Sequence, residues 1–169
     1  WLCPPMVVNL RTSTRILRRV RAIDWTAHGV IHFIASKSAQ VGFGSISPDG
    51  TGFSWELKPG GPIYESFSFA DNNHIAFEAN TPAHPNEVYY KSGSGAPERI
   101  THVNPGLEKV RLGEQEIISY EARDGLEIEG ILIKPVGYEE GSEVPLIVRA
   151  HGGPESHYSN GWLTSYSSP

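Results

Sequence analysis

The feature that most constrains the fold of this chain is an internal repeat with a period of 44 residues. Residues 25–35 align with residues 69–79, and each copy consists of an aromatic residue, a polar turn and an alternating strand with its apolar side chains on one face. The matched apolar pairs, each 44 residues apart, are Ile31 and Ile75, Phe33 and Phe77, and Ala35 and Ala79. A fixed period of this kind is typical of stacked units that cannot bury a hydrophobic face singly.

A second predicted hairpin follows each copy of the repeat. Its strands are residues 41–46 and 52–57 in the first copy, and residues 87–90 and 98–101 in the second. The turns contain Asp-Gly and Gly-Ser-Gly, which supply the positive φ angles that tight hairpin turns need. Four short antiparallel strands in about 44 residues match one propeller blade. A β-sandwich with accidental internal similarity is the alternative.

Two further hairpins are predicted outside the repeat. Upstream, residues 7–10 and 16–20 have the pattern of the outer hairpin of a preceding blade. Downstream, residues 107–116 are charged and irregular and read as a linker, after which residues 117–122 and 126–135 flank an Arg-Asp-Gly turn. The chain starts at Trp1 without an initiator Met and is interpreted as a fragment of a longer protein.

The candidate site follows a continuous apolar run, residues 145–150, which predicts a central strand covered on both faces. The run leads into His151-Gly152-Gly153-Pro154. Glycine amides after such a strand can donate to the oxyanion that forms when a serine attacks a carbonyl, and Gly153 is the first candidate donor, followed by Gly152. Pro154 has no N–H and can only stiffen the loop, and His151 is interpreted as a scaffold residue and not as a catalytic base. An ordinary glycine-rich strand exit is the alternative at this point.

The order of these features resembles the prolyl oligopeptidase family of serine peptidases, and within it the acylaminoacyl peptidase and dipeptidyl aminopeptidase branch. The resemblance is carried by residues 124–130, 133–135, 145–148 and 151–154, and more diffusely by residues 85–89 and 99–101 in the second repeat. It implies the C-terminal blades of a β-propeller in residues 1–106, a linker in residues 107–116, and the first strands of a truncated α/β-hydrolase domain in residues 117–169. Its reaction would be hydrolysis of peptide bonds in oligopeptides by a Ser-Asp-His triad.

The resemblance also implies that this chain holds only part of the catalytic machinery. The backbone of Gly153 would be one half of the oxyanion hole, and no serine lies in a Gly-x-Ser-x-Gly motif. Because the triad follows this loop in α/β-hydrolases, the nucleophile, base and acid are expected downstream and the chain alone is expected to be inactive. Two alternatives remain: an esterase or lipase of the same fold, many of which use a His-Gly-Gly-Gly loop, and a non-catalytic propeller that serves as a binding module.

Charge and composition narrow the classes of partner. The 169 residues include 14 Lys and Arg against 19 Asp and Glu, a net charge of −5, without the basic stripe that nucleic-acid binding needs. No apolar run approaches the roughly 18 residues of a membrane span. The single cysteine, Cys3, cannot form an internal disulfide. The expected partner is an oligopeptide substrate, a homo-oligomer is compatible with the sequence, and a cytoplasmic location is favoured.

Other chemistry-bearing residues give weaker indications. His28 and His32 have i, i+4 spacing, but in a strand these positions lie about 13 Å apart, so no metal is predicted, nor any cofactor. Arg149 is the one charge in the apolar run and is expected to reach the end of the sheet or to pair with a carboxylate. Tyr158 and Trp162 either line an apolar pocket or pack outside the truncated sheet. The cleavage preference is not predicted.

Overall fold

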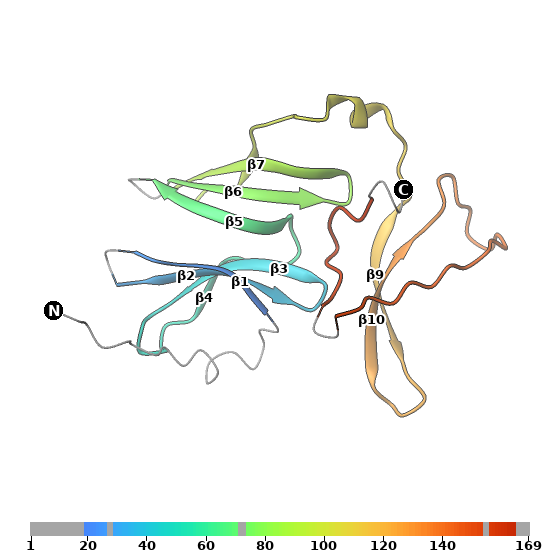
Figure 1. The fold of residues 1–169 in the computed structure, drawn as a ribbon, viewed down its shortest axis with the longest axis horizontal. Coiled ribbons are helices and arrows are strands. Elements are labelled where there is room, and N and C mark those ends of the chain that lie inside the picture. The colour runs from blue at the N-terminus through green and yellow to red at the C-terminus, as the bar shows by residue number, and fades with distance from the viewer. Residues whose placement is uncertain (1–18, 27–28, 71–73, 154–155, 165–169) are drawn as a thin grey trace.

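A computed structural model describes residues 19–26, 29–70, 74–153 and 156–164. They form two four-stranded antiparallel sheets and a separate two-stranded hairpin (Figure 1). The first sheet contains β1 (Arg19–Trp25), β2 (Ile31–Lys37), β3 (Gln40–Ile46) and β4 (Ser54–Leu57). The second contains β5 (Ile63–Ala70), β6 (His74–Thr81), β7 (His84–Ser92) and β8 (Glu98–Arg99). The hairpin contains β9 (Gln115–Glu121) and β10 (Glu127–Ile133).

The two sheets confirm the predicted repeat of four antiparallel strands. In each sheet the strands lie in chain order and neighbours pair antiparallel. The first strands, β1 and β5, begin 44 residues apart, at Arg19 and Ile63. The described residues form neither a closed ring of such sheets nor an α/β-hydrolase domain.

The described end of one predicted strand, residues 19 and 20 of 16–20, belongs to a different unit from the expected one. Residues 19 and 20 are the start of β1 in the first sheet, where Val20 pairs with Ala35, and are not part of a preceding blade. The interpretation failed because β1 carries Arg19, Arg21 and Asp24 and therefore lacks clean alternation of apolar and polar residues. Residues 7–10 and 16–18 lie outside the described residues.

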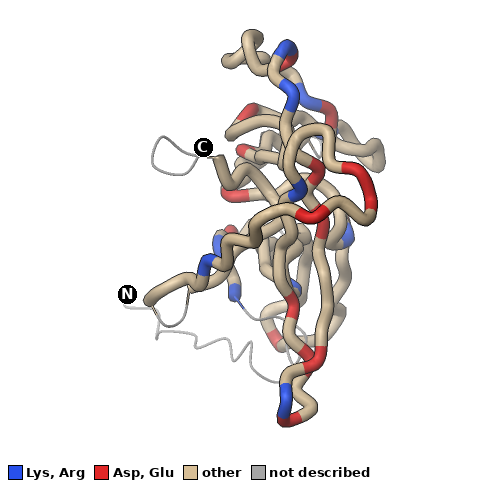
Figure 2. The backbone as a smooth tube through the Cα atoms, turned by 90° about the vertical axis from the view of Figure 1, so that its right-hand side faces the viewer, with Lys and Arg blue, Asp and Glu red and all other residues tan. Residues whose placement is uncertain are grey.

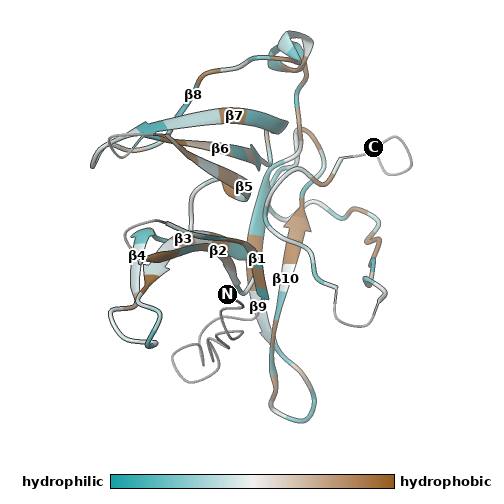
Figure 3. Cartoon of the chain, turned by 60° about the vertical axis from the view of Figure 1, so that its left-hand side comes forward, coloured by the Kyte–Doolittle hydropathy of each residue, from teal (hydrophilic) through white to brown (hydrophobic). Residues whose placement is uncertain are grey.

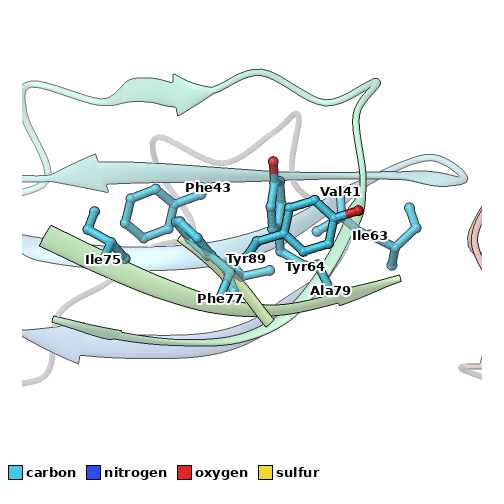
Figure 4. Close-up of a cluster of buried hydrophobic side chains, with 9 residues drawn as sticks. Val41, Phe43, Ile63, Tyr64, Ile75, Phe77, Ala79 and Tyr89 are labelled. Carbon is cyan, nitrogen blue, oxygen red and sulfur yellow. The ribbon is translucent and has the colours of Figure 1, made fainter. Parts of the chain in front are cut away.

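The hydrophobic core lies between the two sheets (Figure 4). It comprises Ile34, Val41 and Phe43 from the first sheet, with Ile63, Tyr64, Ile75, Phe77, Ala79 and Tyr89 from the second. Aromatic rings meet across the gap: the centroids of Phe43 and Phe77 are 5.1 Å apart and the ring planes cross at 81°, an edge-to-face arrangement that adds to the burial energy. The sheets are therefore held together by one shared core.

The two copies of the repeat use their matched positions differently. In β6 the burial alternates, and Ile75, Phe77 and Ala79 all face the first sheet, as predicted. In β2 both faces are buried, because Ile34 joins the shared core while Ile31 and Phe33 pack in a second cluster on the other face of the sheet. The prediction of apolar residues on one face only is therefore wrong for β2, which is covered on both sides.

The β9–β10 hairpin confirms the predicted Asp-Gly turn. Glu127 pairs with Glu121, and the Ala122 N–H donates to the Leu126 carbonyl at 2.8 Å. Gly125 has a φ of 82°, the left-handed conformation for which glycine is preferred. The preceding residues 107–116, predicted as a linker, include the end of a 3₁₀ helix (Pro105–Lys109) and the first two residues of β9. None of the helices in the described ranges has the length and hydropathy of a membrane span.

Glu87 is a buried carboxylate that holds the chain where it leaves the second sheet. Its Oε1 accepts from the Val103 N–H at 2.9 Å, and its Oε2 accepts from the Thr101 hydroxyl. Burial works to raise the pKa of Glu87, but these two hydrogen bonds and the charge of Arg99 outweigh it and hold the pKa below its usual value. The ionised form is therefore the one that the fold stabilises.

We expect protonation of Glu87 to loosen this segment at acidic pH. A depressed folded-state pKa contributes stability above the unfolded value of about 4.3, and that contribution is lost as the pH falls through the folded pKa. Amide-exchange protection of residues 101–103 should fall in that window, and a Glu87→Gln variant should lose this pH dependence. A Glu87 carboxyl pKa at or above about 4.3, measured by NMR titration, would contradict the assignment.

Candidate functional site

The apolar run before the glycine loop is not a covered strand in this structure. Residues 145–150 have no regular structure, and the exposed fractions of Leu146, Ile147 and Val148 are 78%, 90% and 82%. The hydrophobic stretch is visible in brown on the coil that follows β10 (Figure 3). A central strand needs a neighbour on each side and a layer on each face, and the described residues supply neither here. The prediction of a buried strand is wrong for this chain, and Arg149 is exposed with the rest.

The glycine loop itself contains one position that requires glycine. Gly153 has a φ of 117°, and a Cβ added there would lie 3.1 Å from the Cβ of Ser156. Gly152 has no such restriction, since an added Cβ would meet nothing within 4 Å. Within the described residues, no hydrogen bond uses the N–H of Gly152 or Gly153. Pro154, the fourth residue of the motif, lies outside the described residues.

Aromatic and cationic side chains connect the two ends of this loop. His151 is exposed, and its Nδ1 lies 3.3 Å from the carbonyl oxygen of Gly152. The His151 ring meets the Tyr158 ring edge-on, with centroids 6.0 Å apart. The guanidinium carbon of Arg149 lies 5.6 Å from the same Tyr158 centroid, within the range of a cation–π contact. Tyr158 thus contacts residues on both sides of the Ala150–His151 peptide bond.

A pocket of about 450 Å³ adjoins the loop through Tyr158, a volume within the usual range of small-ligand sites. Its walls come from the segment after the loop and from three strands of the two sheets. The lining includes Arg21, Ile63, Glu65, Asn80, His157, Tyr158, Ser159 and Trp162. Tyr158 and Trp162 thus both line a pocket, but its lining is mostly polar and not the apolar pocket that was one of the two alternatives for these residues.

The Arg21 side chain lines this pocket and donates hydrogen bonds to three other side chains. Its Nη1 donates to Glu65 Oε2 at 2.6 Å, its Nε donates to Ser36 Oγ at 3.2 Å, and its Nη2 donates to Ser159 Oγ at 2.5 Å. Only 15% of the Arg21 side chain is exposed. The guanidinium therefore joins β1, β2, β5 and the segment after the glycine loop.

Sequence reasoning missed Arg21, Glu65 and Asn80 as pocket residues. A usable signal was present, because Arg21 and Glu65 are 44 residues apart and so occupy the same place in the two repeats. Oppositely charged residues at equivalent positions of adjacent sheets are candidates for pairing. Asn80 follows the last matched apolar position of its repeat and is 8% exposed.

The described residues do not pair a serine with a histidine at the usual distance of a nucleophile and its base. His157 Nε2 lies 3.5 Å from Ser159 Oγ, beyond the usual 2.6–3.2 Å of such a pair, and Arg21 donates to that hydroxyl. No group of three or more His, Cys, Asp or Glu residues in the described ranges could hold a metal ion. In the part of the chain that the structure describes, Lys and Arg residues are scattered along the tube and do not gather into a stripe (Figure 2).

Two curated proteins with peptidase names are similar to this chain in sequence. The uncharacterized peptidase YuxL of Bacillus subtilis is 27% identical over 103 residues, which is 60% of this chain and 16% of that protein. The acylamino-acid-releasing enzyme of Sus scrofa is 38% identical over 50 residues, which is 30% of this chain and 6% of that enzyme. No family model matches the chain.

Solved structures show the same fold over most of the chain. The acylaminoacyl peptidase of Pyrococcus horikoshii gives a TM-score of 0.69 at 24% identity, covering 87% of this chain and 22% of that one. A variant of the AtxE2 isopeptidase with Astexin3-dC4 bound gives 0.66 at 17% identity, covering 86% of this chain and 22% of that one. Together with the sequence matches, these results confirm the resemblance to prolyl oligopeptidase-family peptidases, over a part of each relative's length.

Proposed function

We propose that this chain is part of a serine peptidase that hydrolyses peptide bonds in oligopeptides, of the acylaminoacyl- or dipeptidyl-peptidase type. The observation that carries the proposal is the sequence similarity to two peptidases, one of them an acylamino-acid-releasing enzyme. In this proposal residues 1–106 are propeller blades, residues 107–116 are a linker and residues 117–169 begin the hydrolase domain. The same similarity favours a peptidase over an esterase or a binding module.

In the proposed reaction the glycine loop stabilises the tetrahedral intermediate. A serine Oγ attacks the scissile carbonyl carbon, its proton passes to a histidine, and the carbonyl oxygen becomes an oxyanion. The Gly153 N–H donates to that oxygen, with Gly152 as the second candidate donor, and His151 and Pro154 hold the shape of the loop. The left-handed φ of Gly153 and the absence of a described hydrogen-bond partner for either amide support this role.

The remaining groups are proposed to come from sequence beyond residue 169. In α/β-hydrolases the nucleophile, acid and base follow this loop in the order Ser, Asp, His, and the residue after the nucleophile supplies the other oxyanion donor. This chain would therefore contribute one half of the oxyanion hole and part of the substrate-facing surface. Alone, it would not catalyse the reaction.

Covalent labelling of the full-length parent protein tests the proposed reaction class. A fluorophosphonate probe should label one serine beyond residue 169, and hydrolysis of an acylaminoacyl p-nitroanilide should fall in proportion to the labelling. Cleavage of short-chain p-nitrophenyl esters without peptide hydrolysis would replace the proposal with the esterase alternative. Absence of both labelling and hydrolysis would leave the binding module.

A further inference from the structure

The segment after the glycine loop, residues 157–163, is fastened to sheets that lie far from it in the sequence. The Asn160 N–H donates to the Ala39 carbonyl at 2.7 Å, and the Trp162 N–H donates to Asn80 Oδ1 at 2.9 Å. On its other side, Gln115 Nε2 donates to Asn160 Oδ1 at 2.8 Å. In Figure 1 this segment, in red, runs between the two sheets and the β9–β10 hairpin.

The fit between this segment and the second sheet is close. Gly161 is buried, and a Cβ added there would lie 2.1 Å from Asn80 Oδ1 and 2.8 Å from Ile63 Cγ1. No real Cβ approaches other atoms so closely, and both neighbours belong to a packed sheet. Asn80 is itself fixed, since its Nδ2 donates to Asn86 Oδ1 at 2.7 Å.

The first sheet holds the same segment through Arg21. The Arg21 guanidinium spans the two sheets through Glu65 and reaches Ser159 with its remaining Nη2. Ser159 follows Tyr158, whose ring contacts His151 and Arg149 beside the glycine loop. A continuous set of contacts therefore runs from the junction of the two sheets to the glycine loop.

We infer that Arg21 and Asn80 are positioning residues that hold the glycine loop in place by clamping residues 157–163 onto the two repeat sheets. The inference rests on the proposed function for the catalytic role of the glycine loop. The contacts that hold residues 157–163 on the sheets can be tested without measuring activity. Residues 157–163 form hydrogen bonds with both sheets and with β9. Because the Tyr158 ring contacts the His151 ring, the position of this segment affects the position of the glycine loop. The repeat sheets would thus set the position of the donor amides as well as forming a surface beside them.

Hydrogen exchange of the full-length parent protein, followed by mass spectrometry, tests the clamp. Asn80→Ala removes the acceptor of the Trp162 N–H, and we expect exchange to rise about tenfold in residues 157–163 and to rise also in residues 150–153. Strands β2 and β6 should keep their exchange rates. Asn80→Asp keeps the acceptor oxygen for the Trp162 N–H but loses the hydrogen bond to Asn86, so it should restore only part of the protection.

Two further variants keep the test decisive. Asn86→Ala removes the partner that fixes Asn80 but keeps the acceptor of the Trp162 N–H, so exchange in residues 150–153 should rise less than it does in Asn80→Ala. Gly161→Ala acts on the segment itself, so it should release residues 150–153 even if Asn80→Ala destabilises the whole sheet. A rise confined to residues 157–163, or no rise in either segment, would overturn the inference whether or not the parent proves to be a peptidase.

Discussion

Under the proposed function, replacement of Gly153 by alanine in the full-length parent protein should lower kcat by about 10²–10³ with little change in KM, the usual cost of losing one oxyanion donor. The backbone at Gly153 has a φ of 117°, which an L-residue rarely adopts, and the new Cβ would lie 3.1 Å from the Cβ of Ser156. The loop must shift to relieve this strain, and the amide shifts with it. Because the oxyanion exists only in the transition state and the intermediate, the loss should fall on kcat.

Gly152 provides a matched control one residue away. Its φ lies outside the positive range, and an added Cβ would meet no atom within 4 Å. The Gly152→Ala variant also keeps its N–H, so its kcat should stay within about twofold of the wild-type value. Equal losses in the two variants would contradict the assignment of Gly153 as the main donor, because Gly152 is the second candidate donor and has no steric restriction of its own.

The 169-residue chain by itself should not hydrolyse acylaminoacyl or dipeptidyl p-nitroanilides above the uncatalysed rate. Enzymes accelerate such reactions by about 10⁶-fold or more, and under the proposed function the triad that supplies this acceleration is not part of these 169 residues. The described residues contain no serine within 3.2 Å of a histidine nitrogen, and the sequence has no Gly-x-Ser-x-Gly motif. The expected signal is therefore that of buffer alone.

The control for this assay shows whether any remaining activity comes from the chain or from a contaminating enzyme. Turnover that rises in proportion to the amount of chain, survives successive purification steps and is insensitive to titration of contaminating serine hydrolases would contradict the expectation. It would also place a nucleophile inside this sequence, with Ser159 beside His157 as the first residue to replace.

The local signals in the sequence predicted most of the strands. The 44-residue period and the Asp-Gly turns depend on side-chain alternation and on backbone conformation, both of which are local properties, and they located β2, β3, β6 and the β9–β10 hairpin. The start of β1 was assigned to the wrong unit because its charged residues break the alternation of apolar and polar positions, and one of them, Arg21, is paired with Glu65 across the sheets. Periodicity alone does not reveal such a pairing.

The failures at the candidate site have a different physical origin. An apolar run such as residues 145–150 shows that a segment has side chains suited to burial. Whether they are buried depends on neighbouring strands, and the described residues supply none for this run. The polar wall of the pocket was missed because it combines Arg21 with Ser159, which are 138 residues apart. The sequence indicated which residues form the glycine loop, but it did not indicate the contacts that hold the following segment on the two sheets.

The most direct test of the account is a crystal structure of the full-length parent enzyme with a peptidyl phosphonate bound covalently to its nucleophile. The phosphonyl oxygen marks the place of the oxyanion. We predict that the Gly153 nitrogen lies about 2.7–3.1 Å from that oxygen, the distance of a working donor. A Gly153 amide turned away and hydrogen-bonded to its own loop, with the phosphonyl oxygen held by other groups, would contradict the account.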